Sequence, residues 1–165
     1  MKVIQMKIQK KKTMMSENQV KKKALNLLSR RDHYKKELKY KLIKRGFSAE
    51  KIEDILQELI NDGYLNDKKF AEEWIKNRIN KKPRGKNLIK AELLEKGVDK
   101  KIIETKLNNL LDPDKEKQMA EILTDKWLNK RNCKNKETKE KLYRYLKNKG
   151  FNDEIIRKII TDINL

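Results

Sequence analysis

Apolar residues recur along the chain at fixed offsets from three glycines, Gly46, Gly97 and Gly150, which are 51 and 53 residues apart. Aliphatic residues stand eight and four positions before each glycine, and apolar residues stand one, six and ten positions after it. These positions are Leu38, Leu42, Phe47, Ile52 and Leu56; Ile89, Leu93, Val98, Ile103 and Leu107; and Leu142, Leu146, Phe151, Ile156 and Ile160. Apolar residues four apart share one face of an α-helix, and glycine ends a helix readily because it adopts a left-handed conformation without strain. The pattern therefore predicts, three times, a helix, a glycine stop and a second amphipathic helix.

A further helix is predicted before each of these pairs. The strings Leu27–Arg31, Trp74–Arg78 and Trp127–Arg131 share two apolar residues, two variable residues and an arginine. Residue types that commonly cap helices stand two positions after the three glycines: Ser48, Asp99 and Asn152. We therefore predict an all-α chain of three tandem three-helix repeats that form an elongated, curved array.

The predicted boundaries place repeat 1 at residues 17–65, repeat 2 at residues 66–112 and repeat 3 at residues 113–165. Residues 1–16 are expected to be a flexible basic tail, because they are rich in lysine and lack a helical apolar face. Within this tail Lys2–Ile8 alternates weakly between polar and apolar residues, a pattern compatible with a short strand.

Composition narrows the class of protein. The 44 Lys and Arg residues outnumber the 25 Asp and Glu residues, which gives a net charge of +19. One cysteine and one histidine do not suffice for a disulfide framework or the usual zinc site, and no apolar run reaches the length of a membrane span. We therefore expect a cytoplasmic protein with an anionic partner and no membrane association.

The positive charge follows the repeat. The middle helix of each repeat, together with the loop before it, carries a net charge of +6 (residues 29–46), +6 (residues 76–97) or +8 (residues 126–150). The last helices carry −4, 0 and −1. Equivalent helices that line one side of an array would form a basic surface suited to an extended polyanion. The alternative is that lysine-rich faces are only solvated and that the composition reflects codon bias.

Ten basic residues in and beside these segments are the candidates for contact with the polyanion: Arg30, Arg31, Lys35, Lys36, Arg78, Lys82, Arg84, Lys86, Arg131 and Lys134. Arg31, Arg78 and Arg131 are foremost, because a guanidinium binds phosphate or carboxylate through two parallel hydrogen bonds. Alternatively, they interact with the dipole at the end of the preceding helix. Trp74 and Trp127 are expected in the core, with stacking on bases as the alternative.

The chain carries no recognisable catalytic constellation. Its glycines are scattered rather than grouped in a nucleotide-binding loop, and His33 and Cys133 are each the only residue of their type. Asp32 is expected to support the start of the helix that follows Ser29, in a capping arrangement, and Tyr64 is expected to pack against the preceding helix after Gly63. We therefore expect a binding module rather than an enzyme, without a cofactor or a metal ion.

Two stretches of the chain resemble RecX proteins. The first runs from Ala24 to Tyr34 and continues with Glu37-Leu38, Leu42 and Arg45-Gly46-Phe47; the second is Gly63–Ala71, followed by Gly85, Ile89, Leu93 and Lys96-Gly97-Val98. The resemblance covers roughly residues 24–165. It implies a regulator of the RecA recombinase that is built from tandem three-helix repeats and has no catalytic residues of its own.

The resemblance also implies the partner. RecX proteins bind along the groove of the RecA–single-stranded-DNA filament and modulate, mostly downward, strand exchange, ATP hydrolysis and repressor cleavage. Because this chain is strongly basic, we expect direct contact with single-stranded DNA as well, and a monomer in solution. Two other functions fit the residues alone: a RecA-independent DNA-binding protein built from tandem helix-turn-helix-like units, and a solenoid adaptor for an acidic protein.

Overall fold

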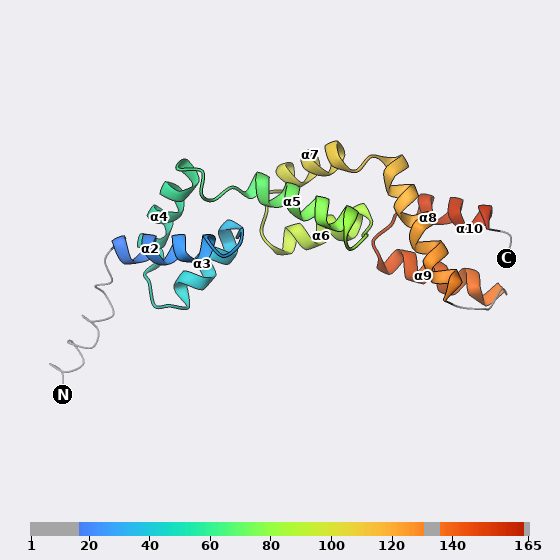
Figure 1. Cartoon of the computed structure of the whole chain (residues 1–165), viewed down its shortest axis with the longest axis horizontal. Helices are drawn as coiled ribbons and strands as arrows, with labels where there is room; N and C mark the ends of the chain where they lie inside the picture. The colour runs from blue at the N-terminus through green and yellow to red at the C-terminus, as the bar shows by residue number, and fades with distance from the viewer. Residues whose placement is uncertain (1–16, 131–135, 164–165) are drawn as a thin grey trace, which may run out of the picture. The chain divides into compact units, whose positions relative to one another are not determined.

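A computed structural model describes residues 17–130 and 136–163. The predicted tail, including Lys2–Ile8, lies outside these ranges, as do Arg131, Cys133 and Lys134. Throughout the described ranges the regular elements are α-helices, as predicted (Figure 1). They are α2 (Glu17–Leu28), α3 (Lys35–Ile43), α4 (Ala49–Asn61), α5 (Asp67–Asn80), α6 (Lys86–Glu95), α7 (Lys100–Leu110), α8 (Pro113–Asn129), α9 (Lys136–Asn148) and α10 (Asp153–Asp162).

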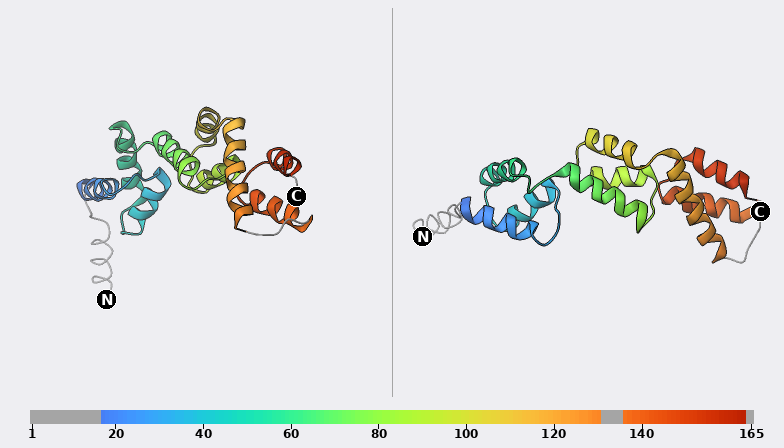
Figure 2. Two further views of the ribbon diagram at one scale, coloured as in Figure 1. Left: turned by 45° about the vertical axis from the view of Figure 1, so that its right-hand side comes forward. Right: turned by 45° about the horizontal axis from the view of Figure 1, so that its top comes forward.

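The helices pack in sets of three. Helices α2, α3 and α4 contact one another, and α8 contacts both α9 and α10, which also contact each other (Figure 2). Helix α6 packs on α7, and α5 joins them through a Trp74–Glu92 hydrogen bond and a Lys106–Glu72 ion pair. The tandem three-helix organisation expected from the spacing of the glycines is thereby confirmed.

The chain divides into two compact units. The first ends at Phe70 and contains α2, α3 and α4 with the start of α5. The second begins at Ala71 and contains the rest of α5 together with α6 to α10. The predicted limits of the individual repeats stay predictions.

Each middle helix ends at its glycine in the way the sequence predicts. Gly46, Gly97 and Gly150 have φ values of 85°, 80° and 88°, in the left-handed region that favours glycine. The residue after each glycine donates its backbone N–H to a carbonyl five residues back: Phe47 to Leu42, Val98 to Leu93 and Phe151 to Leu146. This is the bonding of a Schellman motif, which satisfies carbonyls at the helix end and turns the apolar residue back toward the core.

The predicted apolar positions form the core. Thirteen of them are buried: Leu38, Leu42, Ile52, Leu56, Ile89, Leu93, Val98, Ile103, Leu107, Leu142, Leu146, Phe151 and Ile156. The remaining two, Phe47 and Ile160, are half-buried. In the first unit, α2 adds Val20, Ala24 and Leu27 to the core that the buried residues of α3 and α4 form.

The cap positions are only partly as predicted. Ser48, Asp99 and Asn152 all stand at the N-cap, and the side chains of Asp99 and Asn152 accept backbone N–H groups there. Asp32 was expected to cap the next helix, which is wrong, because α3 begins only at Lys35. The Lys35 N–H is instead bound by Oδ1 of Asp67, at 3.0 Å, from the first turn of α5.

The expected packing of Tyr64 is also wrong. Tyr64 is 58% exposed, whereas the next residue, Leu65, is buried. The Leu65 N–H donates to the carbonyl of Leu59 at 3.0 Å, so the turn after Gly63 directs Leu65, one residue later, onto the helix. Hence the aliphatic side chain fills the core and the phenol stays in solvent.

Candidate functional site

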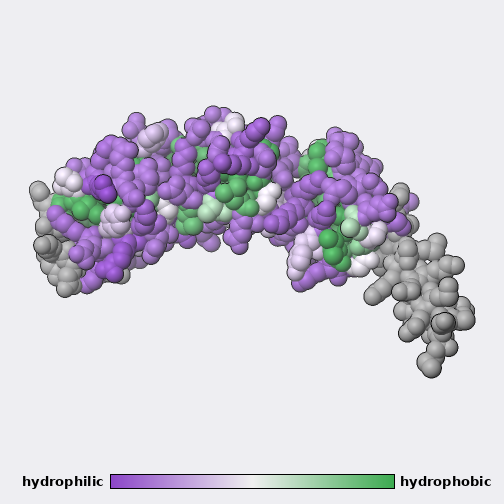
Figure 3. Space-filling view, turned by 180° about the vertical axis from the view of Figure 1, so that it is seen from behind, coloured by the Kyte–Doolittle hydropathy of each residue, from purple (hydrophilic) through white to green (hydrophobic). Residues whose placement is uncertain are grey.

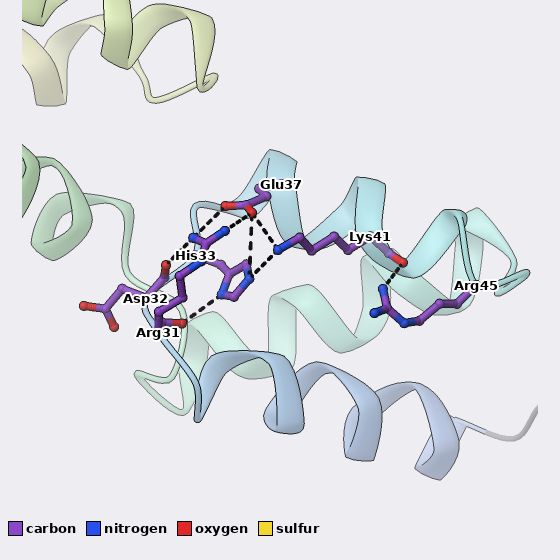
Figure 4. Close-up of polar contacts among 6 residues, drawn as sticks. All are labelled: Arg31, Asp32, His33, Glu37, Lys41 and Arg45. Atoms are coloured by element: carbon purple, nitrogen blue, oxygen red, sulfur yellow. Dashed lines mark hydrogen bonds and ion pairs between the residues drawn. The ribbon is translucent and has the colours of Figure 1, made fainter.

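The Glu37 carboxylate, in the first turn of α3, is the centre of a polar cluster in the first unit (Figure 4). It accepts hydrogen bonds from both terminal nitrogens of the Arg31 guanidinium, and the Lys41 ammonium lies 2.8 Å from Oε1. Partial burial opposes ionisation of Glu37, but the hydrogen bonds from Arg31 and Lys41 outweigh it and lower the pKa of this carboxyl. The cluster therefore holds a charged carboxylate between two cations.

His33 completes this cluster and is buried. Its Nδ1 lies 2.8 Å from the backbone carbonyl of Arg31, and its Nε2 lies 3.0 Å from the Lys41 ammonium. A carbonyl accepts and an ammonium donates, so we assign the proton to Nδ1 and the lone pair to Nε2. Burial lowers the pKa of His33, in agreement with a neutral ring. This histidine therefore organises the connector between α2 and α3.

Arg31 is engaged by that carboxylate rather than placed at a helix end. Helix α2 ends at Leu28, so Arg31 lies in the connector, where it also donates to the carbonyl of Asp32 at 3.0 Å. Its side chain is 55% exposed. Arg31 therefore ties the connector to α3 through the carboxylate fork, and its predicted contact with a polyanion stays a prediction.

Arg78 forms a similar ion pair in the second unit. It lies in the last turn of α5, and its Nε donates to Oε2 of Glu92 on α6 at 2.6 Å. The guanidinium carbon is 4.4 Å from the centre of the Trp74 ring, and Trp74 Nε1 donates to the same Glu92 oxygen at 2.8 Å. Lys96 Nζ lies 4.2 Å from the same ring. The Arg78–Glu92 ion pair therefore links α5, the first helix of its repeat, to α6, the middle helix.

The two tryptophans differ. Trp127 is buried, as predicted, with its ring centre 6.0 Å from that of Tyr145. Trp74 is only half-buried, within the contacts of Arg78, Lys96 and Glu92. Its indole is thus part of a polar cluster rather than of the apolar core.

The remaining candidates fall into two groups. Lys35 forms an ion pair with Glu53 on α4 at 2.6 Å, and the Lys86 ammonium donates to Asn108 on α7 at 2.7 Å. In contrast, Arg30, Lys36 and Lys82 are exposed and have no ion pair within the described part of the chain. Arg84 is half-buried, and its Nε has no acceptor among the described residues. The candidates left for a partner are therefore mainly Arg30, Lys36, Lys82 and Arg84.

The outer face of α3 carries Lys36 together with exposed apolar residues. Tyr40 and Ile43 are 57% and 46% exposed, and the Lys44 ammonium lies 5.0 Å from the centre of the Tyr40 ring. The equivalent face of α6 carries Ala91, Leu94 and Glu95 and is not basic. The positive charge of residues 76–97 is instead concentrated in the connector before α6, so the middle helices do not present equivalent surfaces.

A pocket in the first unit was not predicted. It is lined by Gln19, Lys22, Lys23 and Asn26 on one face of α2, and by Arg45 and Phe47 after α3. The half-buried Phe47 contrasts with its buried equivalents Val98 and Phe151. Each of the four α2 residues stands three or four positions from two of the others in the sequence, and this spacing, which places them on one face of the helix, could have indicated the pocket. Because the glycine pattern assigned Phe47 to the core, sequence reasoning missed the pocket.

Most of the face shown in Figure 3 is hydrophilic, with separate apolar areas. Large apolar residues that are exposed in the described part of the chain include Leu94 and Ile122, at 43% and 50%. None of the helices in the described ranges is long and apolar enough to cross a membrane. The face in Figure 3 is therefore mainly polar.

Comparison with known proteins identifies relatives over most of the chain. Residues 21–59 match the first three-helix domain of RecX and residues 66–107 match the second. A regulatory protein RecX from Pelodictyon phaeoclathratiforme is 39% identical over 133 residues, which are 78% of each chain. One from Chlorobium limicola is 33% identical over 150 residues, which are 88% of this chain and 90% of the relative.

Solved structures agree with this relationship. The crystal structure of RecX from Lactobacillus salivarius superposes with a TM-score of 0.80 and 28% identity, covering 88% of this chain and 95% of that one. A second crystal structure of a regulatory protein RecX, at 22% identity, supports the fold with a TM-score of 0.81 and covers 88% of this chain and 72% of that one. The repeats, the residue matches and the superposition together show that this chain belongs to the RecX family.

Proposed function

We propose that this protein binds the filament of RecA on single-stranded DNA and lowers its recombinase, ATPase and coprotease activities, without catalysis of its own. One observation carries the proposal: in a chain of the RecX family, basic residues that form no ion pair with another described residue lie at or near the connectors that precede the middle helices. Arg30, Lys36 and Lys82 are these residues. They suit the phosphates of a nucleoprotein groove.

The internal ion pairs support this assignment by giving their residues another role. Arg31 binds Glu37 and Arg78 binds Glu92, so each arginine fixes the segment from which the exposed cations project. We assign Arg31 and Arg78 to positioning, and Arg30, Lys36 and Lys82 to contact with the filament. Arg131 and Lys134 lie outside the described residues and stay candidates from the sequence alone.

A titration of DNA-dependent ATP hydrolysis by RecA tests the proposal. The full chain is expected to lower hydrolysis to a plateau, and Arg30→Gln, Lys36→Gln and Lys82→Gln together are expected to shift the titration to higher concentration. Lys100→Gln, Lys101→Gln and Lys115→Gln remove the same charge from exposed positions on α7 and α8 and serve as the control. If the full chain leaves hydrolysis unchanged at saturation, the proposal is wrong. If the two triple variants have equal effects, binding depends only on the net charge and not on these three residues.

A second function has one observation in its favour. The outer face of α3 combines Lys36 and Lys44 with the exposed Tyr40, a composition found on helices that enter the major groove. A RecA-independent DNA-binding protein would select among duplex sequences through this face. Competition between unrelated duplexes separates the two functions, because filament binding predicts no preference among duplex sequences.

A further inference from the structure

The backbones of α6 and α9 meet directly in the second unit. The Gly85 N–H donates to the carbonyl of Lys149 at 2.8 Å, and the Asn87 N–H donates to that of Gly150 at 3.1 Å. A Cβ added at Gly85 would lie 2.3 Å from the carbonyl carbon of Gly150 and from the nitrogen of Phe151. Only a glycine allows this approach, so the start of one middle helix is joined to the end of the next.

Two cations flank this junction on the two chain segments that form it. Arg84 immediately precedes Gly85, and its buried Nε has no acceptor among the described residues. Lys149 precedes Gly150 and is half-buried, with Nζ 5.3 Å from the centre of the Tyr145 ring. Burial of the Lys149 side chain is the main cause that lowers its pKa, and the positive charge of Arg84 lowers it further. The two positive charges are therefore close enough to repel each other.

The described residues supply no carboxylate to balance the pair. The nearby Glu116 directs Oε1 to the N–H of Lys86 at 2.7 Å, and burial raises the pKa of Glu116. By comparison, the half-buried Arg78 pairs with Glu92, and Arg31 pairs with Glu37. A buried guanidinium nitrogen without an acceptor beside a second cation is unfavourable, and a bound anion relieves both penalties.

From this geometry we propose that Arg84 and Lys149 form a phosphate site at the α6–α9 junction, and that its occupant is a backbone phosphate of single-stranded nucleic acid. A guanidinium matches the paired oxygens of a phosphodiester, and an ammonium adds a mobile point charge. The inference rests on the proposed function for the identity of the strand, whereas the anion site itself follows from the junction.

Occupancy of the site has a structural consequence. The two cations belong to segments of predicted repeats 2 and 3, which the Gly85 and Gly150 backbones already join. A phosphate bound to both would oppose their repulsion and so stabilise the junction. Binding of a strand would thus fix the relative positions of α6 and α9 within the second unit.

Anisotropy of a fluorescent oligothymidylate, measured with the full chain over a salt series, tests the site. The double variant Arg84→Gln and Lys149→Gln is expected to bind about tenfold more weakly at low salt. The slope of log affinity against log salt is expected to fall by about 0.7, the value for one lost phosphate contact on a single strand. The control double, Lys100→Gln and Lys101→Gln, removes equal charge from exposed positions on α7, outside the segments that form the junction.

Thermal unfolding separates a lost site from a lost fold. Without ligand the double variant is expected to melt at the same Tm as the wild type or higher, because a repulsive pair has been removed. Inorganic phosphate is expected to raise the Tm of the wild type and not that of the variant. If phosphate raises the Tm of the wild type but the variant binds oligothymidylate as well as the wild type, the site binds free phosphate and the nucleic-acid occupant is wrong.

Equal slopes and affinities for the two double variants would overturn the inference. If RecA ATPase inhibition persists in that case, the proposed function stands without this site. If ATPase inhibition is absent from the wild type while oligothymidylate binding depends on Arg84 and Lys149, the phosphate site stands and the proposed function fails.

Discussion

The Glu116 carboxylate on α8 accepts the backbone N–H of Lys86, the first residue of α6, at 2.7 Å. Asp67 on α5 does the same for Lys35, the first residue of α3, at 3.0 Å. In both cases the first helix of one repeat supplies the N-terminal cap for the middle helix of the repeat before it. A helix leaves its first N–H groups unpaired, so these caps stabilise the starts of α3 and α6.

Loss of the Glu116 cap is expected to destabilise the second unit. Glu116→Ala should cost about 0.5–2 kcal/mol, the usual loss for an N-cap, because the half-buried Lys86 N–H then lacks its acceptor. Glu116→Gln keeps a carbonyl oxygen for this N–H and should cost less. Urea unfolding followed by circular dichroism measures both. Equal losses for the two variants would show that the hydrogen bond is unimportant.

Glu116 also makes a pH-dependent contribution. Burial raises its pKa in the folded chain above the ordinary 4.5, so the folded state binds the proton more tightly than the unfolded one. This contribution is therefore full below pH 4.5 and is lost as the pH rises through the folded-state pKa. The Glu116→Gln variant should lack this decline, which a comparison of unfolding at pH 4.5 and pH 7 detects.

His33 is the only histidine of the chain, so its state can be read without assignment. We expect a long-range ¹H–¹⁵N spectrum to show the proton on Nδ1 at neutral pH, because Nε2 accepts from Lys41. Burial lowers its pKa below 6.5, so its contribution to stability is present above pH 6.5 and is lost as the pH falls through the lowered value. A ring that protonates above pH 6.5 would contradict this arrangement.

Arg30 and Arg31 are neighbours with different predicted roles. Arg31→Ala should cost about 1 kcal/mol of stability, because the half-buried Glu37 loses its bidentate partner. Arg30→Ala should change stability by less than about 0.5 kcal/mol, since Arg30 is exposed, yet weaken binding to the filament. Paired measurements of unfolding and of RecA ATPase inhibition test this division. A larger stability loss for Arg30→Ala than for Arg31→Ala would reverse it.

The fold was predictable because its signals are local. Gly46, Gly97 and Gly150 each end a helix whose last apolar residues lie four positions apart, and both features can be read from neighbouring residues. The helix caps were less predictable where they come from a distant segment. Asp32 is the nearest acidic residue before α3, but Asp67, 32 residues away from Lys35, forms the cap.

The candidate site was predictable in residue type but not in role. Sequence reasoning placed Arg31 and Arg78 foremost because of their repeated position, whereas their carboxylates, Glu37 and Glu92, do not occupy equivalent positions. No spacing rule links such pairs, so only the packing of the helices shows that these arginines are engaged. Lys149 was missed for the same reason: its neighbour Arg84 lies on a segment that only the fold brings close.

Phe47 and Phe151 occupy the same position after their glycines but differ in burial. Phe151 is fully buried, so Phe151→Ala should cost about 3–5 kcal/mol. Phe47 is half-buried beside the pocket of Lys22, Lys23 and Arg45, and Phe47→Ala should cost less than half as much because fewer contacts are lost. Chemical unfolding of the two variants measures the difference, with Val98→Ala as an intermediate control at the third equivalent position. If the Phe47 and Phe151 variants lost equal stability, Phe47 would be buried as completely as Phe151. The core of the first repeat would then exclude solvent as well as that of the third.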